Sequence, residues 1–166
     1  MELLRIRPAA EGDLPALTEI YNYEVLNGVA TLDLQPKDLA DRKKWLEAHN
    51  VKNHPLIVCE REGVVAGYAS LSPYREKEAY CATVELSVYV HPDHRRQGVA
   101  MALMEAILTM AREDANTHNV VSVITAGNEA SLKLHQRFGF TYCGCIPQVG
   151  VKFGRSLDIV NYSLIV

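Results

Sequence analysis

The chain has 166 residues, of which 48% are hydrophobic and 22% are charged, and its formal net charge at pH 7 is −3. This length is enough for one domain with a sizeable core, so we expect residues 1–166 to form a single domain. The slight acidity argues against a nucleic-acid-binding protein, which would carry a basic surplus. No apolar run approaches the length of a membrane span, and the charged first residues lack the apolar core of a signal peptide.

Cysteine and histidine usage bears on the redox compartment and on metal binding. The chain has four cysteines and six histidines. Cys59, Cys81, Cys143 and Cys145 form no C-x-x-C pair, which zinc and redox sites often contain, and we interpret them as reduced thiols in a cytoplasmic protein. The histidines are scattered along the sequence, so we expect no metal site.

The chain opens with a short strand and a helix. Residues 3–7 predict the strand, which Pro8 ends because proline has no N–H to donate to a neighbouring strand. A helix over residues 13–27 follows, since Asp13 is a good N-cap and Pro15 suits the first turn.

A second helix and a hairpin come next. We expect the helix over residues 36–49, with Leu39, Trp45 and Leu46 facing inward. Trp45 is either a core residue that anchors this helix or the wall of a ligand pocket. Residues 56–60 and 64–71 then predict a hairpin, whose turn needs the positive φ that Gly63 adopts readily.

A strand over residues 83–90 is the centre of the predicted fold. Its side chains alternate, with Val84, Leu86, Val88 and Val90 on one side and Thr83, Glu85, Ser87 and Tyr89 on the other. Residues 91–93 end the strand at Pro92. A basic turn follows, and then an apolar run with helical spacing from Val99 to Met110.

This strand, turn and helix predict an anion site. The first turn of a helix leaves backbone N–H groups without partners, and the helix dipole adds positive charge there. Gly98 allows a ligand to approach the backbone, while Arg95 and Arg96 add full charges. Such a site suits a diphosphate. The six-residue pattern alone also fits an ordinary strand-to-helix loop with solvated arginines.

The remaining elements alternate between strand and helix. We expect a buried strand over residues 120–125, a helix from Asn128 to Gly139, and strands over residues 141–145 and 156–165. This alternation predicts an α/β layered domain.

Two motifs carry a resemblance to a known family. The pattern Arg95-x-x-Gly98-x-Ala100 follows a strand, and Asn128 opens a helix that leads to Gly139-Phe140. Both resemble motifs of the GNAT superfamily of acetyl-CoA-dependent N-acetyltransferases, from near residue 5 to near residue 165. Residues 83–90, Leu134-His135 and residues 147–158 resemble the group that acetylates phosphinothricin, methionine sulfone or methionine sulfoximine.

The resemblance implies a GNAT fold, a twisted mixed sheet flanked by helices, in which the central strand splays from the next one. It also implies acetyl-CoA as a co-substrate, bound in that gap, with strand residues 88–90 acting through their backbones. The implied acetyl-CoA-binding residues are Val88, Tyr89, Val90, Arg95, Arg96, Gln97, Gly98, Val99, Ala100, Met101, Asn128, Ser131 and His135.

Two residues are catalytic candidates. An acceptor's α-amine has a pKa of about 7.7–8.0 in solution, so a base is useful near neutral pH. The resemblance implies that Glu85 is this base, directly or through water, although an alternating strand also places glutamates toward solvent. His135 stands where many GNAT enzymes have a tyrosine that protonates the leaving thiolate. The alternatives are that it contacts the cofactor or packs.

The resemblance also implies where the acceptor binds. The substrate-binding candidates are Tyr74, Arg75, Glu76, Lys77, Glu85, Leu86 and Ser87. Arg75 retains a cation that can hold an acceptor carboxylate. The loop departs from the group at Lys77 and Cys81, and Leu32 stands in place of an early tryptophan, which leaves the acceptor open.

We therefore expect an N-acetyltransferase that acts on a small amino acid or analogue of the methionine sulfone, methionine sulfoximine or phosphinothricin type. Transfer is expected in a ternary complex without a covalent enzyme intermediate. The alternatives are another amine, such as a polyamine, an aminoglycoside or a protein N-terminus, and a non-catalytic module that senses acyl-CoA. The resemblance also implies a homodimer, with the C-terminal strands and residues 147–158 near the interface.

Overall fold

The computed structural model describes residues 3–166, which form one mixed sheet of seven strands and four α-helices. The helices are α1 (Leu14–Asn27), α2 (Leu39–Glu47), α3 (Val99–Glu113) and α4 (Glu129–Arg137). The strands are β1 (Leu4–Pro8), β2 (Leu56–Arg61), β3 (Val64–Pro73), β4 (Thr83–Val90), β5 (Asn119–Thr125), β6 (Thr141–Lys152) and β7 (Arg155–Ile165). This architecture confirms the mixed α/β fold class.

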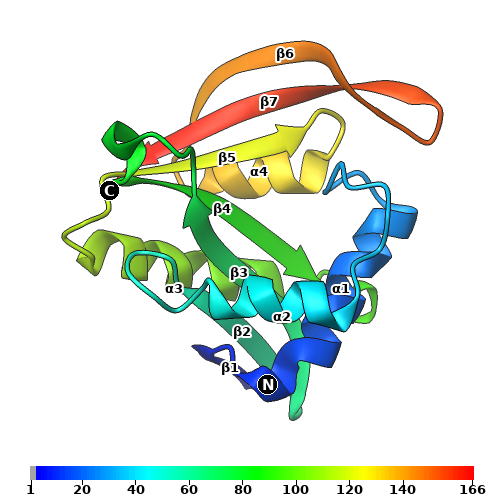
Figure 1. Cartoon of the computed structure of the whole chain (residues 1–166), viewed down its shortest axis with the longest axis vertical. Coiled ribbons are helices and arrows are strands. Elements are labelled where there is room, and N and C mark those ends of the chain that lie inside the picture. The colour runs from blue at the N-terminus through cyan, green and yellow to red at the C-terminus, as the bar shows by residue number, and fades with distance from the viewer. Residues whose placement is uncertain (1–2) are drawn as a thin grey trace.

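The strand order is β1-β2-β3-β4-β5-β7-β6, and only the β4–β5 pair is parallel. β4 pairs with β3 along nearly its whole length, from Val84 to Val90. Its pairing with β5 covers only Thr83–Glu85 against Asn119–Val121. Beyond Glu85 the two strands diverge, as Figure 1 shows, so the sheet is split at its centre.

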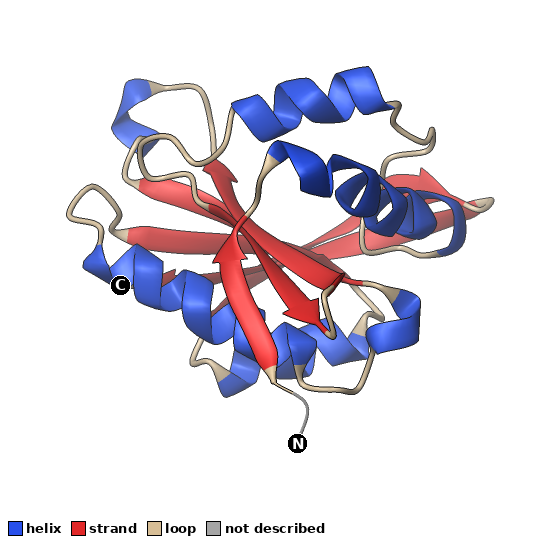
Figure 2. Cartoon of the chain, turned by 90° about the horizontal axis from the view of Figure 1, so that it is seen from below, coloured by secondary structure: helices blue, strands red, loops and turns tan. Residues whose placement is uncertain are grey.

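Helices cover both faces of the sheet (Figure 2). α3 and α4 pack on one face against the larger core, which includes Val84, Leu86 and Leu103. α1 and α2 pack on the other face against a smaller cluster that includes Leu17 and Tyr68. The alternation predicted for β4 is confirmed, since its valines and leucine join the larger core and Tyr89 packs against the smaller one.

The helix predicted over residues 36–49 is shorter, and one inward residue was wrong. It begins after Asp38, whose side chain accepts a hydrogen bond from the Asp41 N–H. Leu39 is 53% exposed, whereas Arg42 is 5% exposed on the buried side. The reason is that the Arg42 guanidinium stacks on the rings of Tyr21 and Trp45, and its long apolar stem buries surface on the same side of the helix.

The last hairpin is longer than predicted. β6 continues to Lys152 instead of ending at Cys145, so residues 147–158 are mostly strand, and residues 150–152 pair with residues 155–157. The predicted strands left residues 146–155 between them, but the pairing of β6 with β7 resumes at Gly150 after a register shift between Ile146 and Gly150. A bulge of this kind accommodates a proline inside a strand.

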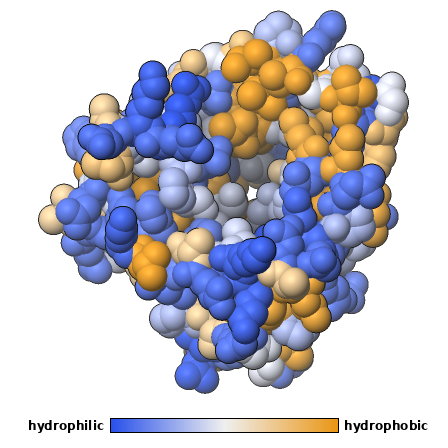
Figure 3. All heavy atoms as spheres, viewed as in Figure 1, coloured by the Kyte–Doolittle hydropathy of each residue, from blue (hydrophilic) through white to orange (hydrophobic). Residues whose placement is uncertain are grey.

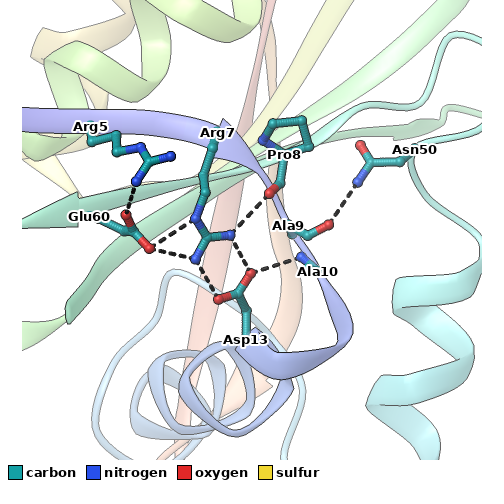
Figure 4. Close-up of polar contacts among 8 residues, drawn as sticks. All are labelled: Arg5, Arg7, Pro8, Ala9, Ala10, Asp13, Asn50 and Glu60. Carbon is teal, nitrogen blue, oxygen red and sulfur yellow. Dashed lines mark hydrogen bonds and ion pairs between the residues drawn. The ribbon is translucent and has the colours of Figure 1, made fainter. Parts of the chain in front are cut away.

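Asp13 does not cap α1 through its side chain, contrary to the prediction. Its carboxylate instead receives two hydrogen bonds from Arg7, at 2.7 and 2.8 Å, and one from the Ala10 N–H. Arg7 also donates to Glu60 on β2 at 2.6 and 2.9 Å (Figure 4). The network therefore ties the start of α1 to the edge of the sheet.

Asp13→Asn is expected to lower the free energy of unfolding by about 2 kcal/mol at pH 7, because Arg7 loses an ionised, mostly buried partner. The Arg7 guanidinium holds the pKa of Asp13 below its ordinary value of 3.8. This contribution is complete above that ordinary value and is lost as the pH falls through the lowered pKa. Urea unfolding at pH 7 and at acidic pH measures both effects.

Arg5→Ala is the control for this prediction. Arg5 reaches Glu60 only at 3.9 Å and its side chain is 73% exposed, so its removal should change stability by less than about 0.5 kcal/mol. Equal losses in the two variants would contradict the role given to Asp13.

Candidate active site

The main cleft lies where β4 and β5 separate. Its volume is about 690 Å³, and the surface is hollowed at the same place in Figure 3. Ser87–Val90 of β4 line one side, Val123–Thr125 of β5 line the other, and α4 contributes Ser131 and His135. Since β4 has no strand partner there, its outward N–H and C=O groups are available to an extended, amide-rich ligand.

One end of this cleft is the N-terminus of α3. Gly98 is the N-cap residue and has φ +82°, a conformation that favours glycine. Five of the six residues from Arg95 to Ala100 line the cleft. The exception is Gln97, whose side chain donates to the Asp93 carbonyl at 3.4 Å. The turn predicted as an anion site therefore lies at a helix N-terminus, where the first backbone N–H groups have no intrahelical partners.

The two arginines of this turn differ in their surroundings. Arg95 forms an ion pair with Glu24 of α1, and its guanidinium lies 5.6 Å from the centre of the Tyr23 ring. Arg96, with φ +59°, has no recorded ion pair or hydrogen bond among residues 3–166. Arg96 and the helix dipole thus provide the unneutralised positive charge.

Asn128 and Ser131 also line the cleft. The Asn128 side chain accepts a hydrogen bond from the Ser131 N–H at 3.4 Å, which confirms the predicted N-cap of α4. The remaining cofactor-binding candidates, Val99 and Met101, line the cleft from the first turn of α3.

His135 lines the cleft but is only 5% exposed. Its Nδ1 lies 2.7 Å from the Ser131 carbonyl oxygen, which only accepts, so the ring proton sits on Nδ1. Nε2 lies 2.8 Å from Ser122 Oγ and accepts from that hydroxyl. Burial lowers the pKa of His135, so the neutral ring has no free proton to give. This geometry favours packing and positioning over proton donation.

Glu85 lies at the point where β4 leaves β5. It is the last β4 residue paired with β5, where it lies opposite Val121. On the other side it pairs with Ser72 of β3. The carboxylate has no hydrogen bond or ion pair recorded among the described residues, and burial raises its pKa above the ordinary 4.5. A half-buried carboxylate with a raised pKa is suited to accept a proton near neutral pH.

A second cleft of about 280 Å³ adjoins the first. Ser87 and Tyr89 line both, so β4 forms their common wall. The other lining residues are Tyr21, Asp33, Lys37, Asp41, Arg42, Trp45, Tyr68, Ser70 and Ser72. Trp45 lines this cleft and packs against the smaller core, so both interpretations of it hold.

The predicted acceptor loop lies elsewhere. Tyr74, Arg75, Glu76 and Lys77 line neither of these two clefts, and Arg75 stacks near the rings of Tyr74 and Tyr80. The Leu86 side chain is buried in the larger core, on the opposite face from Glu85, so among residues 85–87 only Ser87 reaches either cleft.

Arg42 is the main cleft residue that sequence reasoning missed. Its spacing to Trp45, three positions along one helix, places both side chains on the same face. That spacing was the available signal, but a charged residue in a helix is usually on the solvent side.

Three kinds of comparison with known proteins bear on this site. Residues 18–140 match the family described as Acetyltransferase (GNAT) family. The L-methionine sulfoximine/L-methionine sulfone acetyltransferase of Salmonella typhimurium is 42% identical over 97% of this chain and 94% of its own length. Among the similar solved structures are a ribosomal-protein-alanine N-acetyltransferase of Brucella melitensis and the acetyltransferase yncA of Salmonella typhimurium with its cofactor acetyl-CoA, each with a TM-score of 0.94. The Brucella structure is 44% identical to this chain, and the match covers 98% of this chain and 99% of that one. The Salmonella structure is 40% identical, and the match covers 98% of this chain and 94% of that one.

Proposed function

The chain belongs to the acetyltransferase (GNAT) family, and on that premise we propose that it transfers an acetyl group from acetyl-CoA to the amino group of a small amino acid or amino acid analogue. We call the main cleft the donor cleft and the second cleft the acceptor cleft. The single observation that carries the proposal is the split between β4 and β5, beside which the two clefts meet at Ser87 and Tyr89.

The donor cleft fits acetyl-CoA. The N-terminus of α3 with Arg96 suits the diphosphate, and the unpaired edge of β4 suits the two amides of the pantetheine arm. Acetyl-CoA supplies a thioester that an amine can attack directly. We assign the N–H of Val90 to the thioester oxygen, where it would stabilise the developing negative charge.

Glu85 is the proposed base. Glu85 precedes Ser87 by two residues on β4, so both lie on the face of the sheet that carries the acceptor cleft. Its carboxylate takes the amine proton directly or through water. Among residues 3–166 no cysteine lines either of these two clefts, which supports direct attack in a ternary complex. His135 holds Ser131 and Ser122 in place, and the departing CoA thiolate takes its proton from solvent to leave as the free thiol.

The proposed acceptor is an amino acid of the methionine sulfone, methionine sulfoximine or phosphinothricin type. The Salmonella relative named for the first two supports this class. The Brucella structure, named for a ribosomal-protein alanine, supports a protein N-terminus as the competing acceptor. A second cleft of only about 280 Å³ suits a free amino acid better than a chain terminus.

We also propose that the protein is a cytoplasmic homodimer built from one domain. β6 is an edge strand whose exposed side chains include Ile146, Val149 and Val151, and Phe153 follows it in the turn, each at least 47% exposed. Hydrophobic side chains gather over the β6–β7 arm at the top of Figure 3. An unpaired apolar edge of this kind favours association with a second copy. Among residues 3–166, no helix is long and apolar enough to cross a membrane.

The proposal is tested by measuring free-thiol release from acetyl-CoA with a panel of amines: methionine sulfone, phosphinothricin, a polyamine and a peptide with N-terminal alanine. Preferred turnover of the amino acids supports it. Preferred turnover of the polyamine or the peptide would contradict the proposed acceptor and would still support an acetyltransferase. Tight acetyl-CoA binding without turnover of any amine would favour a sensing module.

His135→Gln separates positioning from proton donation. Because both ring nitrogens are held by serine oxygens, we expect the free energy of unfolding to fall by about 1–3 kcal/mol. We expect kcat to change by less than about tenfold, since general acid catalysis is worth about 10²–10⁴-fold. Urea unfolding and initial rates across pH measure the two. A loss of about 10³-fold in kcat in a stable variant would contradict the positioning role.

A further inference from the structure

Glu24 is an acidic residue inside the donor cleft. It lies in the last turn of α1 and lines this cleft together with Arg95 and Arg96. Its side chain is only 12% exposed, and its carboxylate forms an ion pair with the Arg95 guanidinium. A carboxylate at the end of the cleft that suits a diphosphate repels such a ligand, so its position there calls for an explanation.

The stability of α1 does not explain this carboxylate. The C-terminal end of a helix carries partial negative charge, so an acidic side chain in the last turn is unfavourable. Lys152 of β6, which is 2% exposed, compensates the helix end instead. Its Nζ donates to the carbonyl oxygens of Glu24 and Thr31, at 3.2 and 2.8 Å. The ion pair recorded for the Glu24 carboxylate among residues 3–166 is the one with Arg95.

The end of α1 fixes the position of the Glu24 carboxylate. Gly28 is the C-cap residue, and its N–H donates to the Glu24 carbonyl oxygen at 2.9 Å. A Cβ added at Gly28 would clash with Glu24 Oε2. The carboxylate therefore fills the space that a side chain at position 28 would take, and from there it reaches Arg95.

The empty cleft and the occupied cleft make different demands on Arg95. In the empty cleft, Glu24 neutralises Arg95, while Arg96 has no recorded ion pair or hydrogen bond among the described residues. A diphosphate at the N-terminus of α3 attracts both guanidinium groups. If Arg95 turns to the diphosphate, the mostly buried Glu24 carboxylate loses its partner. If Arg95 stays with Glu24, the diphosphate has only Arg96 as a free cation. Either arrangement costs binding free energy.

We propose that Glu24 limits the affinity of the donor cleft, because its carboxylate competes with the CoA diphosphate for Arg95. This inference rests on the part of the proposed function that assigns acetyl-CoA to the donor cleft. The competition weakens the binding of acetyl-CoA and of the product CoA alike. Product release limits turnover in many enzymes, so a cleft that does not hold CoA too tightly favours repeated turnover.

The test measures binding directly. Acetyl-CoA, CoA and S-acetylpantetheine, which has the thioester and both amides but no diphosphate, are titrated by calorimetry into wild type, Glu24→Gln, Glu24→Ala and Glu19→Gln. Glu19 is the matched control, since it is an acidic residue on the same helix whose side chain is 71% exposed and lies outside the donor cleft. Melting temperature and acetylation of methionine sulfone are measured in parallel.

We expect Glu24→Gln and Glu24→Ala to bind acetyl-CoA and CoA about tenfold more tightly than wild type does. The gain should shrink as the salt concentration rises, because salt screens interactions between charges. Inhibition of acetylation by added CoA should strengthen to the same extent. Affinity for S-acetylpantetheine should not change, and Glu19→Gln should match wild type throughout. Glu24→Ala keeps the test decisive if Glu24→Gln does not fold.

Unchanged or weaker binding of acetyl-CoA in the Glu24 variants overturns the inference, and acetylation by wild type then still supports the proposed function. A purely structural role predicts weaker binding together with a lower melting temperature, because Glu24 opposes the lowering of the Lys152 pKa that burial causes. An equal gain for S-acetylpantetheine also overturns the inference, since the effect would not depend on the diphosphate.

Two further outcomes concern the proposed function itself. Tighter binding of acetyl-CoA in the Glu24 variants without acetylation of any amine supports the role of Glu24 and contradicts the acetyltransferase. Failure of wild type to bind acetyl-CoA contradicts both.

Discussion

Glu85→Gln is expected to lower kcat by about 10²–10⁴-fold while leaving acetyl-CoA affinity unchanged. Glutamine fills nearly the same space on β4 but cannot accept the amine proton. Because Glu85 lines neither of the two clefts directly, the donor cleft should remain intact. Initial rates with methionine sulfone, together with calorimetric binding of acetyl-CoA, measure the two quantities.

The pH dependence gives a second test of Glu85. Burial raises its pKa above 4.5, so kcat/KM should fall as the pH drops through that raised value and the carboxylate becomes protonated. A carboxyl group whose pKa is raised by folding lowers the stability of the folded protein as the pH rises, because folding then buries a charge. Glu85→Gln should therefore melt at the wild-type temperature or above it at pH 7.

Glu105→Gln is the matched control, since Glu105 is an exposed carboxylate on α3. It should leave kcat, acetyl-CoA affinity and melting temperature unchanged. Full activity of Glu85→Gln, or an equal loss in both variants, would contradict the assignment of Glu85 as the base.

Gly67→Ala is expected to lower both stability and acetyl-CoA affinity. A Cβ at Gly67 would lie 2.7 Å from the Tyr89 carbonyl oxygen, 3.0 Å from Val99 Cγ1 and 3.2 Å from Leu103 Cδ1. β3 therefore approaches β4 and the first turn of α3 more closely than any side chain permits. The added methyl group must push these elements apart, at a cost of about 1–3 kcal/mol in the free energy of unfolding.

The affinity loss follows because the displaced parts line the donor cleft. Tyr89 belongs to the edge of β4 that faces it, and Val99 is the first residue of the helix that forms the anion site. We expect acetyl-CoA to bind about tenfold more weakly, the equivalent of about 1.4 kcal/mol. Urea unfolding and calorimetry measure the two losses.

Gly12→Ala is the control for Gly67→Ala. A Cβ added at Gly12 would meet no atom within 4 Å, so this variant tests the loss of glycine flexibility without a clash. It should not lower acetyl-CoA affinity or stability. If Gly67→Ala kept the wild-type stability and acetyl-CoA affinity, β3 and α3 could separate freely, which would contradict the close approach described.

Much of the fold could be predicted from local patterns. The alternation in β4, the Glu62-Gly63 turn and the proline in the first turn of α1 each depend on neighbours in sequence, and all three are confirmed. Asp13 could not be assigned this way. It has a good N-cap side chain, but Arg7 and the Ala10 N–H take its oxygens instead, and the resulting ion pairs join α1 to β1 and β2.

The two clefts also differ in how far local sequence patterns could predict them. The anion end of the donor cleft is formed by residues close together in the chain, between Arg95 and Met101, so its motif is visible in the sequence. The second cleft brings together α1, α2, β3 and β4, whose residues are distant in sequence. Arg42 joins it only because rings from three of these elements surround its side chain, and no local pattern encodes that arrangement.

The central claim is acetyl transfer to an amino acid in a ternary complex, and the initial rate of CoA thiol release tests it most directly. The rate is measured with wild-type protein over a grid of acetyl-CoA and L-methionine sulfone concentrations, with mass spectrometry of the product. The account predicts an N-acetylated amino acid and double-reciprocal lines that intersect, because both substrates must be bound before reaction. Parallel lines, or thiol release that does not depend on the amino acid, would contradict it.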